Sequence, residues 1–298
     1  MELSNLNLNL LMCFKVVAEQ LSISKASEIL FITQPAISSQ IKKLEIYLEE
    51  RLFDRHNRGL LLTPTGELLL QKVQEMHFIL ENTIEAVQNL QNSVKGPLHL
   101  GTYTTISSYL LPKVLADFLD GYPDIRITYS YESTNTILEK VAKYQIDCAV
   151  LSDIPNDNRL VIKPFFQDEL LFVASTKNKE IPQHIEAKYL QEVRFLSYPL
   201  RFDYCYKTVE KKYGKYLEKA FCPIETTSFD TLKQCVLENL GVTFMPKYLI
   251  TEELRSGKLK RVLIGKEEIP ITFFFVTHKN VSKKVQVLQN FIEKAFTV

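Results

Sequence analysis

Amide, hydroxyl and ammonium side chains gather in residues 33–45, which read Thr-Gln-Pro-Ala-Ile-Ser-Ser-Gln-Ile-Lys-Lys-Leu-Glu. An amide such as that of Gln34 can form two hydrogen bonds with the edge of adenine. Hydroxyls such as those of Ser38 and Ser39 can reach base edges or phosphates, and lysines attract phosphates. These residue types indicate contact with duplex DNA.

A helix must position these side chains. Thr33 is expected to be its N-cap, with the hydroxyl accepting a hydrogen bond from a free amide, and Pro35 lies in the first turn, where a missing N–H costs nothing. Steps of four, three and four residues give one apolar face, made of Ile37, Ile41, Leu44 and Leu48. The polar side chains therefore lie elsewhere on the helix.

Neighbouring elements complete a DNA-binding motif. We expect Ser24 to cap a helix over Lys25–Phe31, and a tight turn then leads to the next helix. The two helices and the turn form a helix-turn-helix motif. Residues 51–66 contain two short apolar runs around Gly59 and predict a wing. Residues 6–20 fit a further helix packed behind the motif.

The order and spacing of these residues resemble the DNA-binding domain of LysR-type transcriptional regulators. The segments that carry the resemblance are Ser24-Lys25-Ala26, Thr33 to Ser38, Gln40-Ile41, Leu44-Glu45, Leu52 to Arg55 and Leu62 to Gly66. The sequence departs from the family pattern at Leu21, Ser27 and Ser39. Because the family often has Arg or Lys at the position of Ser39, the target sequence is less well defined than the fold.

The resemblance implies that dimers or tetramers bind a dyad-related site on double-stranded DNA, with RNA polymerase as a further partner. The residues expected to contact DNA are Ser24, Lys25, Thr33, Gln34, Pro35, Ser38, Ser39, Lys42, Lys43, Arg55, Arg58 and Thr63. The chain has a net charge of only +1, and residues 33–66 contain five basic and four acidic side chains. We therefore expect the basic groups to converge on one surface while the acids face away.

The composition fits an ordinary globular protein of about two domains, with 298 residues, 46% of them hydrophobic and 24% charged. No apolar run approaches the roughly twenty residues that cross a bilayer, and the N-terminus lacks the basic start of a signal peptide, so we expect a cytoplasmic protein. The motifs Gly-x-Ser-x-Gly, His-Glu-x-x-His and the phosphate-binding glycine loop are absent from the sequence. We expect neither enzymatic activity nor a metal or cofactor.

A helix predicted over residues 65–92 carries apolar residues at heptad spacing. The seam consists of Leu69, Val73, Met76, Leu80, Thr83, Val87 and Leu90. The seam is thin for such a long helix, which favours pairing with a second copy of the helix in a dimer; the alternative is a helix lying on its own domain.

After Gly96-Pro97 the pattern changes to alternating strands and helices, which predicts α/β layers with a mostly parallel sheet. Strands are expected at 98–102, 125–131, 146–151, 160–166, 169–174, 193–198, 224–227, 242–245 and 270–276. Helices are expected at 110–119, 136–144, 204–220, 231–240 and 281–296.

This part resembles the effector-binding domain of the same family, which is similar to type 2 periplasmic binding proteins. The predicted fold class is α/β with an all-α winged helix-turn-helix domain at the N-terminus. The predicted domains are a DNA-binding domain (1–64), a linker helix (65–94) and an effector-binding domain (95–298). Within the last, subdomain I comprises 95–165 and 268–298, subdomain II comprises 166–267, and the chain crosses between them near 163–167 and 266–271.

A small anionic effector is expected between the subdomains, because open α/β sheets bind ligands beyond the carboxyl ends of their strands. The first predicted loop has five Ser and Thr hydroxyls in residues 102–108, Arg201 could hold a carboxylate, and Phe202, Tyr204 and Phe229 could wall the cleft. The candidate contacts are Thr102, Thr104, Thr105, Ser152, Tyr198, Arg201, Phe202, Thr227, Ser228 and Phe229. The alternative is that the hydroxyls only cap helices and that Arg201 pairs with Asp203 or Glu225.

Two other functions stay open, a small-molecule-binding α/β protein and a non-specific DNA-compacting protein. Salt-dependent binding without a preferred site would identify the second. Five cysteines form no Cys-x-x-Cys pair. Peroxide-sensing members of the LysR-type family pair two cysteines in the effector-binding domain. The resemblance therefore makes Cys205 and Cys222 candidates for a redox switch.

Overall fold

The computed structural model describes residues 6–56, 59–88, 94–152, 154–198, 206–265 and 268–296. The chain forms two compact units, one of residues 1–91 with 143–145 and the other of residues 92–142 with 146–298.

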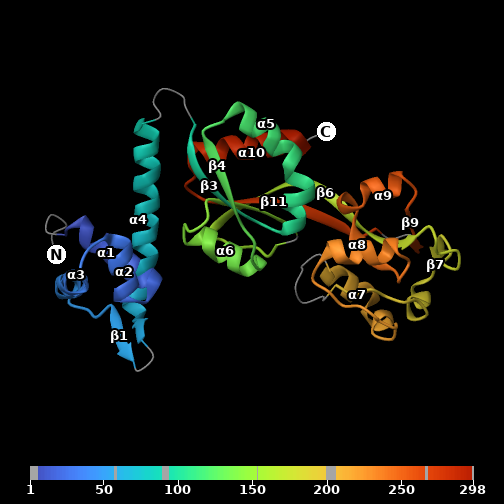
Figure 1. Cartoon of the computed structure of the whole chain (residues 1–298), viewed down its shortest axis with the longest axis horizontal. Helices are drawn as coiled ribbons and strands as arrows, with labels where there is room; N and C mark the ends of the chain where they lie inside the picture. The colour runs from blue at the N-terminus through green and yellow to red at the C-terminus, as the bar shows by residue number, and fades with distance from the viewer. Residues whose placement is uncertain are drawn as a thin grey trace. The chain divides into compact units, whose positions relative to one another are not determined.

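The first unit contains three short helices, a two-stranded hairpin and a long helix (Figure 1). These are α1 (Leu8–Gln20), α2 (Ile23–Leu30), α3 (Gln34–Leu48), β1 (Phe53–His56), β2 (Gly59–Leu62) and α4 (Pro64–Gln88). The apolar residues predicted to face inward do so, because Ile37 and Leu44 are fully buried and Ile41 is 8% exposed. They pack with Phe14 and Val17 of α1 in one core, so the predicted helix-turn-helix is confirmed.

The predicted cap of α2 is wrong. Ser22, not Ser24, is the N-cap, and its hydroxyl oxygen accepts a hydrogen bond from the Lys25 amide at 3.3 Å. The helix starts early because Ile23 packs against the core, which places Ser24 inside the first turn. Thr33 is the N-cap residue of α3 as predicted, but its side chain makes no capping hydrogen bond.

The wing is confirmed as an antiparallel hairpin in which Phe53 pairs with Leu62 and His56 with Gly59. Glu45 of α3 holds the start of this hairpin, because its Oε1 accepts from the amides of Leu52 at 2.8 Å and Phe53 at 3.4 Å. Gly66 lies against the same point of the chain, where a Cβ atom would meet the Leu52 carbonyl oxygen at 2.2 Å. Helix α3, the wing and helix α4 are thus joined at Leu52.

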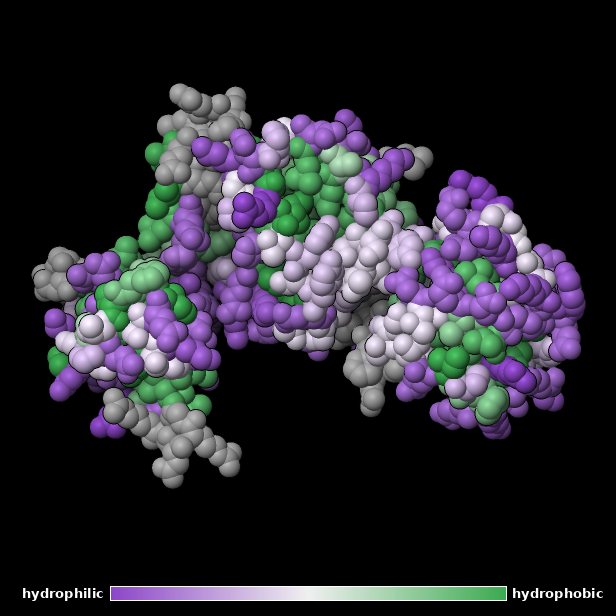
Figure 2. Space-filling model, viewed as in Figure 1, coloured by the Kyte–Doolittle hydropathy of each residue, from purple (hydrophilic) through white to green (hydrophobic). Residues whose placement is uncertain are grey.

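The heptad seam of α4 divides into two parts. Its first residues, Leu69, Val73 and Met76, pack in the core of their own unit. The second half exposes apolar side chains instead, as the hydrophobic surface along this helix in Figure 2 shows, and these are Ile79, Leu80, Ile84 and Val87. The first half of the helix therefore lies on its own unit, and pairing with a second copy stays a prediction for the second half, where Ile79 and Ile84 lie outside the predicted seam. Leu90 lies outside the described residues.

The second unit is built on a seven-stranded sheet with the order β4-β3-β5-β11-β6-β8, and β9 pairs with β6. Its strands are β3 (Gly96–Thr102), β4 (Ile125–Ser130), β5 (Cys148–Ser152), β6 (Leu160–Ser175), β7 (His184–Ile185), β8 (Thr243–Pro246), β9 (Leu259–Arg261), β10 (Leu263–Ile264) and β11 (Pro270–His278). Its helices and helical turns are η2 (Ile106–Leu110), α5 (Leu111–Gly121), α6 (Thr134–Ala142), η3 (Ala187–Gln191), α7 (Tyr206–Leu217), α8 (Phe229–Leu237), η5 (Lys247–Leu249), α9 (Thr251–Arg255) and α10 (Lys283–Phe296).

The sheet is mixed, and the prediction of a mostly parallel sheet is wrong. Strand β3 pairs in parallel with β4 and β5, whereas β11 pairs antiparallel with β5 and β6, and β6 pairs antiparallel with β8 and β9. The reason is that β11 returns from the end of the chain into the middle of the sheet, which sequence-local alternation of strands and helices does not indicate.

The two strands predicted at 160–166 and 169–174 are one strand, β6. It pairs with β11 from Leu160 to Glu169 and with β8 or β9 from Leu170 to Ser175 (Figure 1). Residues 163–167, where the chain is predicted to cross between subdomains, therefore lie inside a continuous strand. An irregularity in the register leaves Phe165 as an extra residue opposite Phe273 and Phe274.

Two other predicted strands, 193–198 and 224–227, are absent as strands. Only isolated bridges form there, joining Arg194 to Phe221, Phe195 to Val242 and Ser197 to Glu225. Conversely, β7, β9 and β10 were not predicted, because strands of two or three residues are too short to show an alternating pattern.

Candidate nucleic-acid interface and ligand-binding loops

Helix α3 presents its polar residues to solvent at its N-terminal end. Gln34 is the first residue of the helix and is exposed, as are Thr33, Pro35 and Ser39, while Ser38 is half-buried. Lys42 and Lys43 are exposed one turn further on. Because Ile37 and Ile41 are buried between them, the apolar side fixes the direction in which the polar side points.

The start of α2 lies beside the start of α3. Gln34 Nε2 donates to Ser24 Oγ at 3.5 Å, and the Ser27 hydroxyl donates to the Ser24 carbonyl at 2.7 Å. Ser24 and Lys25 are exposed. Residues from both helices of the motif are thus brought to one surface, with an amide and a hydroxyl in mutual contact.

Thr63 has a structural role that the sequence did not reveal. Its hydroxyl donates to the Arg51 carbonyl at 2.7 Å and accepts from the Gly66 amide at 3.0 Å. It therefore caps α4 and binds it to the hairpin. Arg58 lies outside the described residues, and of Arg55 only the backbone, in β1, is described.

Acidic groups lie nearer to the basic ones than expected. A hollow of about 770 Å³ beside α3 is lined by Lys42 and Arg51 together with Glu45, Glu49, Glu50 and Asp54. The expectation that these acids face away is wrong at this end of the helix. Residues 33–44 contain no acid, so the N-terminal half of α3 is the part suited to a polyanion.

The first predicted ligand loop follows β3. Thr102 is fully buried and its hydroxyl donates to the Val150 carbonyl at 2.8 Å, so it joins two strands. Ser152 is 6% exposed at the end of β5. Thr104 is exposed and Thr105 half-buried, so these two hydroxyls are the more accessible ones. Because β3 and β5 are parallel, their carboxyl ends share one edge of the sheet.

Other hydroxyls of this loop make local contacts. Ser107 Oγ donates to the Thr104 carbonyl at 2.9 Å and accepts from Tyr131 at 3.0 Å, and the Tyr103 hydroxyl lies 2.6 Å from that of Thr134. These hydrogen bonds therefore fix the loop through contacts that all lie within residues 103–134.

Three more candidate contacts, Thr227, Ser228 and Phe229, lie at the start of α8. Ser228 is the N-cap, with its oxygen accepting from the Thr231 amide at 3.2 Å, and Thr227 is exposed. Phe229 is 7% exposed and stacks on Tyr198 with ring centroids 4.5 Å apart. Capping thus explains Ser228, as the alternative interpretation had it. Arg201, Phe202 and Tyr204 lie outside the described residues.

Three residues that were not among the candidates join the segment after β3 to α8. The Tyr109 hydroxyl donates to the Asp230 carboxylate, and Lys233 Nζ donates to the Tyr109 hydroxyl at 3.0 Å. Asp230 and Lys233 belong to α8, whereas Tyr109 belongs to η2. Contacts between residues more than 100 positions apart leave no signal in a single sequence.

Reactive or metal-binding chemistry has little support in the described part of the chain. Burial raises the pKa of the Cys13 and Cys148 thiols, which makes them unreactive. Cys222 is exposed, but Cys205, its candidate redox partner, lies outside the described residues. The described residues include no cluster of three His, Cys, Asp or Glu suited to a metal, and no described helix is both long and apolar enough to span a membrane.

Comparisons with known proteins cover nearly the whole chain. The family model described as bacterial regulatory helix-turn-helix protein, lysR family, matches residues 8–67, and the model described as LysR substrate binding domain matches residues 91–297. A probable RuBisCO transcriptional regulator of Chlorokybus atmophyticus is 30% identical over 284 residues, which cover 92% of this chain and 89% of that protein. A protein of the same name from Cyanidium caldarium is 31% identical over 283 residues, covering 91% and 87%.

Solved structures show the same fold. Full-length OxyR from Pseudomonas aeruginosa matches with a TM-score of 0.72 at 20% identity, covering 97% of this chain and 95% of that one. Vibrio fischeri DarR, solved in complex with DNA, matches with a TM-score of 0.58 at 20% identity and covers 97% and 99%. The predicted fold class, a winged helix-turn-helix domain followed by an α/β domain, is confirmed.

Proposed function

This chain belongs to the LysR family of transcriptional regulators, which are not enzymes, and we propose that it binds a dyad-related DNA site through α3 under the control of a small anionic effector. In this proposal Gln34, Ser38 and Ser39 contact base edges in the major groove. Lys25, Lys42, Lys43 and the two arginines Arg55 and Arg58 contact phosphates.

The observation that carries this proposal is the exposure of Gln34 and Ser39 on a helix whose apolar residues Ile37, Ile41 and Leu44 are buried. A glutamine amide offers both a donor and an acceptor to adenine, whereas lysines contact the charge that all sequences share. Selectivity is therefore assigned to the amide, and most of the salt dependence to the lysines.

Replacing Gln34 by Ala should weaken binding to the operator by roughly 1–3 kcal/mol and relax its base preference. Fluorescence anisotropy on an operator fragment recovered from genomic binding sites, and on a scrambled fragment, measures both quantities. Lys42→Gln should instead weaken binding to both fragments alike and reduce the slope of log affinity against log salt by about 1.

A matched control is Gln71→Ala, which removes the same amide from an exposed position of α4. It should leave both affinities unchanged. Equal losses on operator and scrambled DNA for Gln34→Ala would contradict the assignment of base reading to this residue. Equal affinity of the unmodified protein for both fragments would instead indicate a DNA-compacting protein.

We further propose that the effector lies near the loop after β3 and the start of α8, where Thr104, Thr105 and Thr227 offer accessible hydroxyls. Tyr198, Arg201 and Phe202 are the proposed partners for an aromatic or apolar part and for a carboxylate. Hydroxyl donors near the start of a helix favour an anion.

Calorimetry against a set of metabolic carboxylates and oxyanions tests this part. For a ligand that binds, Thr104→Ala should lower affinity about fivefold, as expected for one lost hydrogen bond, and Arg201→Ala should lower it further. Thr128→Ala, which changes an exposed threonine of β4, is the matched control. Absence of heat with every compound, or intact binding in both variants, would contradict the site.

We propose a dimer or tetramer as the DNA-binding form, acting in the cytoplasm with RNA polymerase as a further partner. The exposed apolar residues of α4 support this assembly. Mapping genomic binding sites would identify the regulated genes, and their neighbourhood would indicate the effector.

A further inference from the structure

Lys233 is one of the few charged side chains that are buried in the described part of the chain. It is 7% exposed, and its Nζ lies 3.0 Å from the Tyr109 hydroxyl, 3.2 Å from the Leu249 carbonyl oxygen and 3.4 Å from Glu253 Oε1. A buried ammonium group is stable only when such partners satisfy it. Its position in α8 is therefore fixed with respect to three other segments.

Tyr109 contacts this cation in two ways. Its hydroxyl accepts from Lys233, and its ring lies under Nζ, which is 4.5 Å from the ring centroid. The same hydroxyl donates to Asp230, in the first turn of α8. The hydrogen bond to Asp230 and partial burial raise the pKa of Tyr109. The side chain is 40% exposed, so solvent and ligands can reach it.

Tyr109 also occupies an unusual backbone element, the π-helical turn η2, directly after the proposed effector loop. Such turns are rare and often accompany functional sites. The other hydroxyl contacts of this loop, Ser107 with Tyr131 and Tyr103 with Thr134, stay within residues 103–134. Tyr109 instead reaches Asp230 and Lys233 of α8, more than 100 residues away in the sequence.

We propose that Tyr109, Asp230 and Lys233 form a clasp that positions the loop after β3 against α8 in one arrangement of the protein, and that an effector acts by changing this contact. The inference rests on the proposed effector site and specifies how that site is regulated. A ligand can shift the protein between two arrangements only by the difference in its affinity for them. A contact present in one arrangement and weakened in the other supplies that difference.

The test uses the full-length protein without effector. Tyr109→Phe keeps the ring beside Lys233 and removes the hydroxyl, and Asp230→Asn weakens the same contact from the other side. Either variant should speed amide hydrogen exchange about fivefold in residues 103–110 and in the first turn of α8, as expected for a lost hydrogen bond. The double variant should exchange no faster than Tyr109→Phe alone, because removing the hydroxyl already removes its hydrogen bond to Asp230.

Tyr131→Phe is the matched control, since it removes a tyrosine hydroxyl that bonds Ser107 within the same half. It should alter exchange near Ser107 and leave α8 unchanged. The functional readout is the footprint on operator DNA without added effector, whose length or bend should change in Tyr109→Phe and in Asp230→Asn but not in Tyr131→Phe.

Unchanged exchange in α8 for both clasp variants would overturn the proposal. Altered exchange with an unchanged footprint would overturn it too, because the contact would then only support the fold. The exchange measurement needs neither effector nor DNA, so it stays informative if the proposed effector site is wrong. Loss of DNA selectivity in Gln34→Ala, in turn, tests the DNA-binding proposal without involving the clasp.

Discussion

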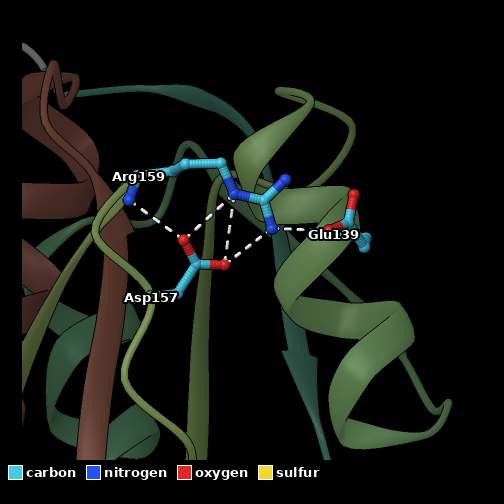
Figure 3. A network of polar contacts seen from close by, with 3 residues as sticks. All are labelled: Glu139, Asp157 and Arg159. Carbon is cyan, nitrogen blue, oxygen red and sulfur yellow. Dashed lines mark hydrogen bonds and ion pairs between the residues drawn. The ribbon is translucent and has the colours of Figure 1, made fainter.

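At the scale of single residues, Arg159 shows how one guanidinium can fix a loop. It binds Asp157, with Nη2 2.6 Å from Oδ2, and also the carboxylate of Glu139 in α6 (Figure 3). Asp157 accepts from the Arg159 amide as well, at 2.9 Å. The segment that leads from β5 into β6 is thereby tied to α6.

This contact predicts a local pH dependence. The hydrogen bond from the Arg159 side chain lowers the pKa of Asp157 below its usual value of 3.8. A carboxyl group whose pKa is lower in the folded state stabilises the fold above its unfolded pKa, and this contribution is lost as pH falls through the folded pKa. In a carbon-13 titration, Arg159→Gln should return the pKa of Asp157 towards 3.8, and Lys163→Gln, which removes a positive charge elsewhere, should not. An unchanged titration in Arg159→Gln would contradict this account.

Single residues were predictable from sequence where local spacing decides their environment. The spacing of Ile37, Ile41 and Leu44 was enough to predict that Gln34 and Ser39 are exposed. The partners of Tyr109 were not predictable, because they depend on how distant segments pack. Thr63 shows a third case: it was predicted to contact DNA, and in the structure its hydroxyl binds the Arg51 carbonyl and the Gly66 amide.

At the scale of elements, the start of α4 is a point of close packing. An alanine normally favours a helix over glycine by about 1 kcal/mol. At Gly66 the added Cβ would lie 2.2 Å from the Leu52 carbonyl oxygen, a backbone atom that cannot rotate away. Gly66→Ala should therefore destabilise the first unit by roughly 1–3 kcal/mol, measured by urea unfolding.

Gly121→Ala is the matched control for that prediction, because a Cβ there meets its nearest neighbour, Phe291, only at 4.0 Å. It should be neutral or slightly stabilising. A neutral Gly66→Ala would show that the hairpin and α4 can separate without cost.

Elements were predictable to different degrees. Helix α3 was predicted nearly to the residue because its cap, Pro35 and apolar face agree. Strand β6 was divided in two because its middle is exposed and irregular around Lys163 to Phe166, which mimics a loop. The strands predicted at 193–198 and 224–227 form only isolated bridges. Apolar runs indicate burial whether or not the chain forms the continuous hydrogen bonds of a strand.

At the scale of the whole molecule, the second half of α4 is the surface best suited to assembly. Ile84 is 55% exposed and Val87 63% exposed, on a helix whose first half is packed in its own unit. Ile84→Glu should raise the dimer dissociation constant by roughly 100-fold, because a paired apolar residue would be replaced by like charges in both copies. Sedimentation velocity at micromolar concentration measures this.

Gln71→Glu adds the same charge at an exposed site earlier in the helix and should leave the assembly intact. Since Ile84 is exposed within its own unit, the unfolding of the monomer should hardly change in Ile84→Glu. An unaltered sedimentation profile in that variant would show that copies associate through a different surface.

The continuity of β6 limits how this protein can be dissected genetically. One backbone from Leu160 to Ser175 supplies neighbours to β11 at its beginning and to β8 and β9 at its end. Fragments divided at the formal boundary of residue 166 would each inherit half a strand and lose the hydrogen bonds of the other half. Two such fragments are therefore not expected to restore the function when they are produced together. Exchanging the entire segment from 94 to 296 for that of another regulator, by contrast, preserves every pairing of the strand.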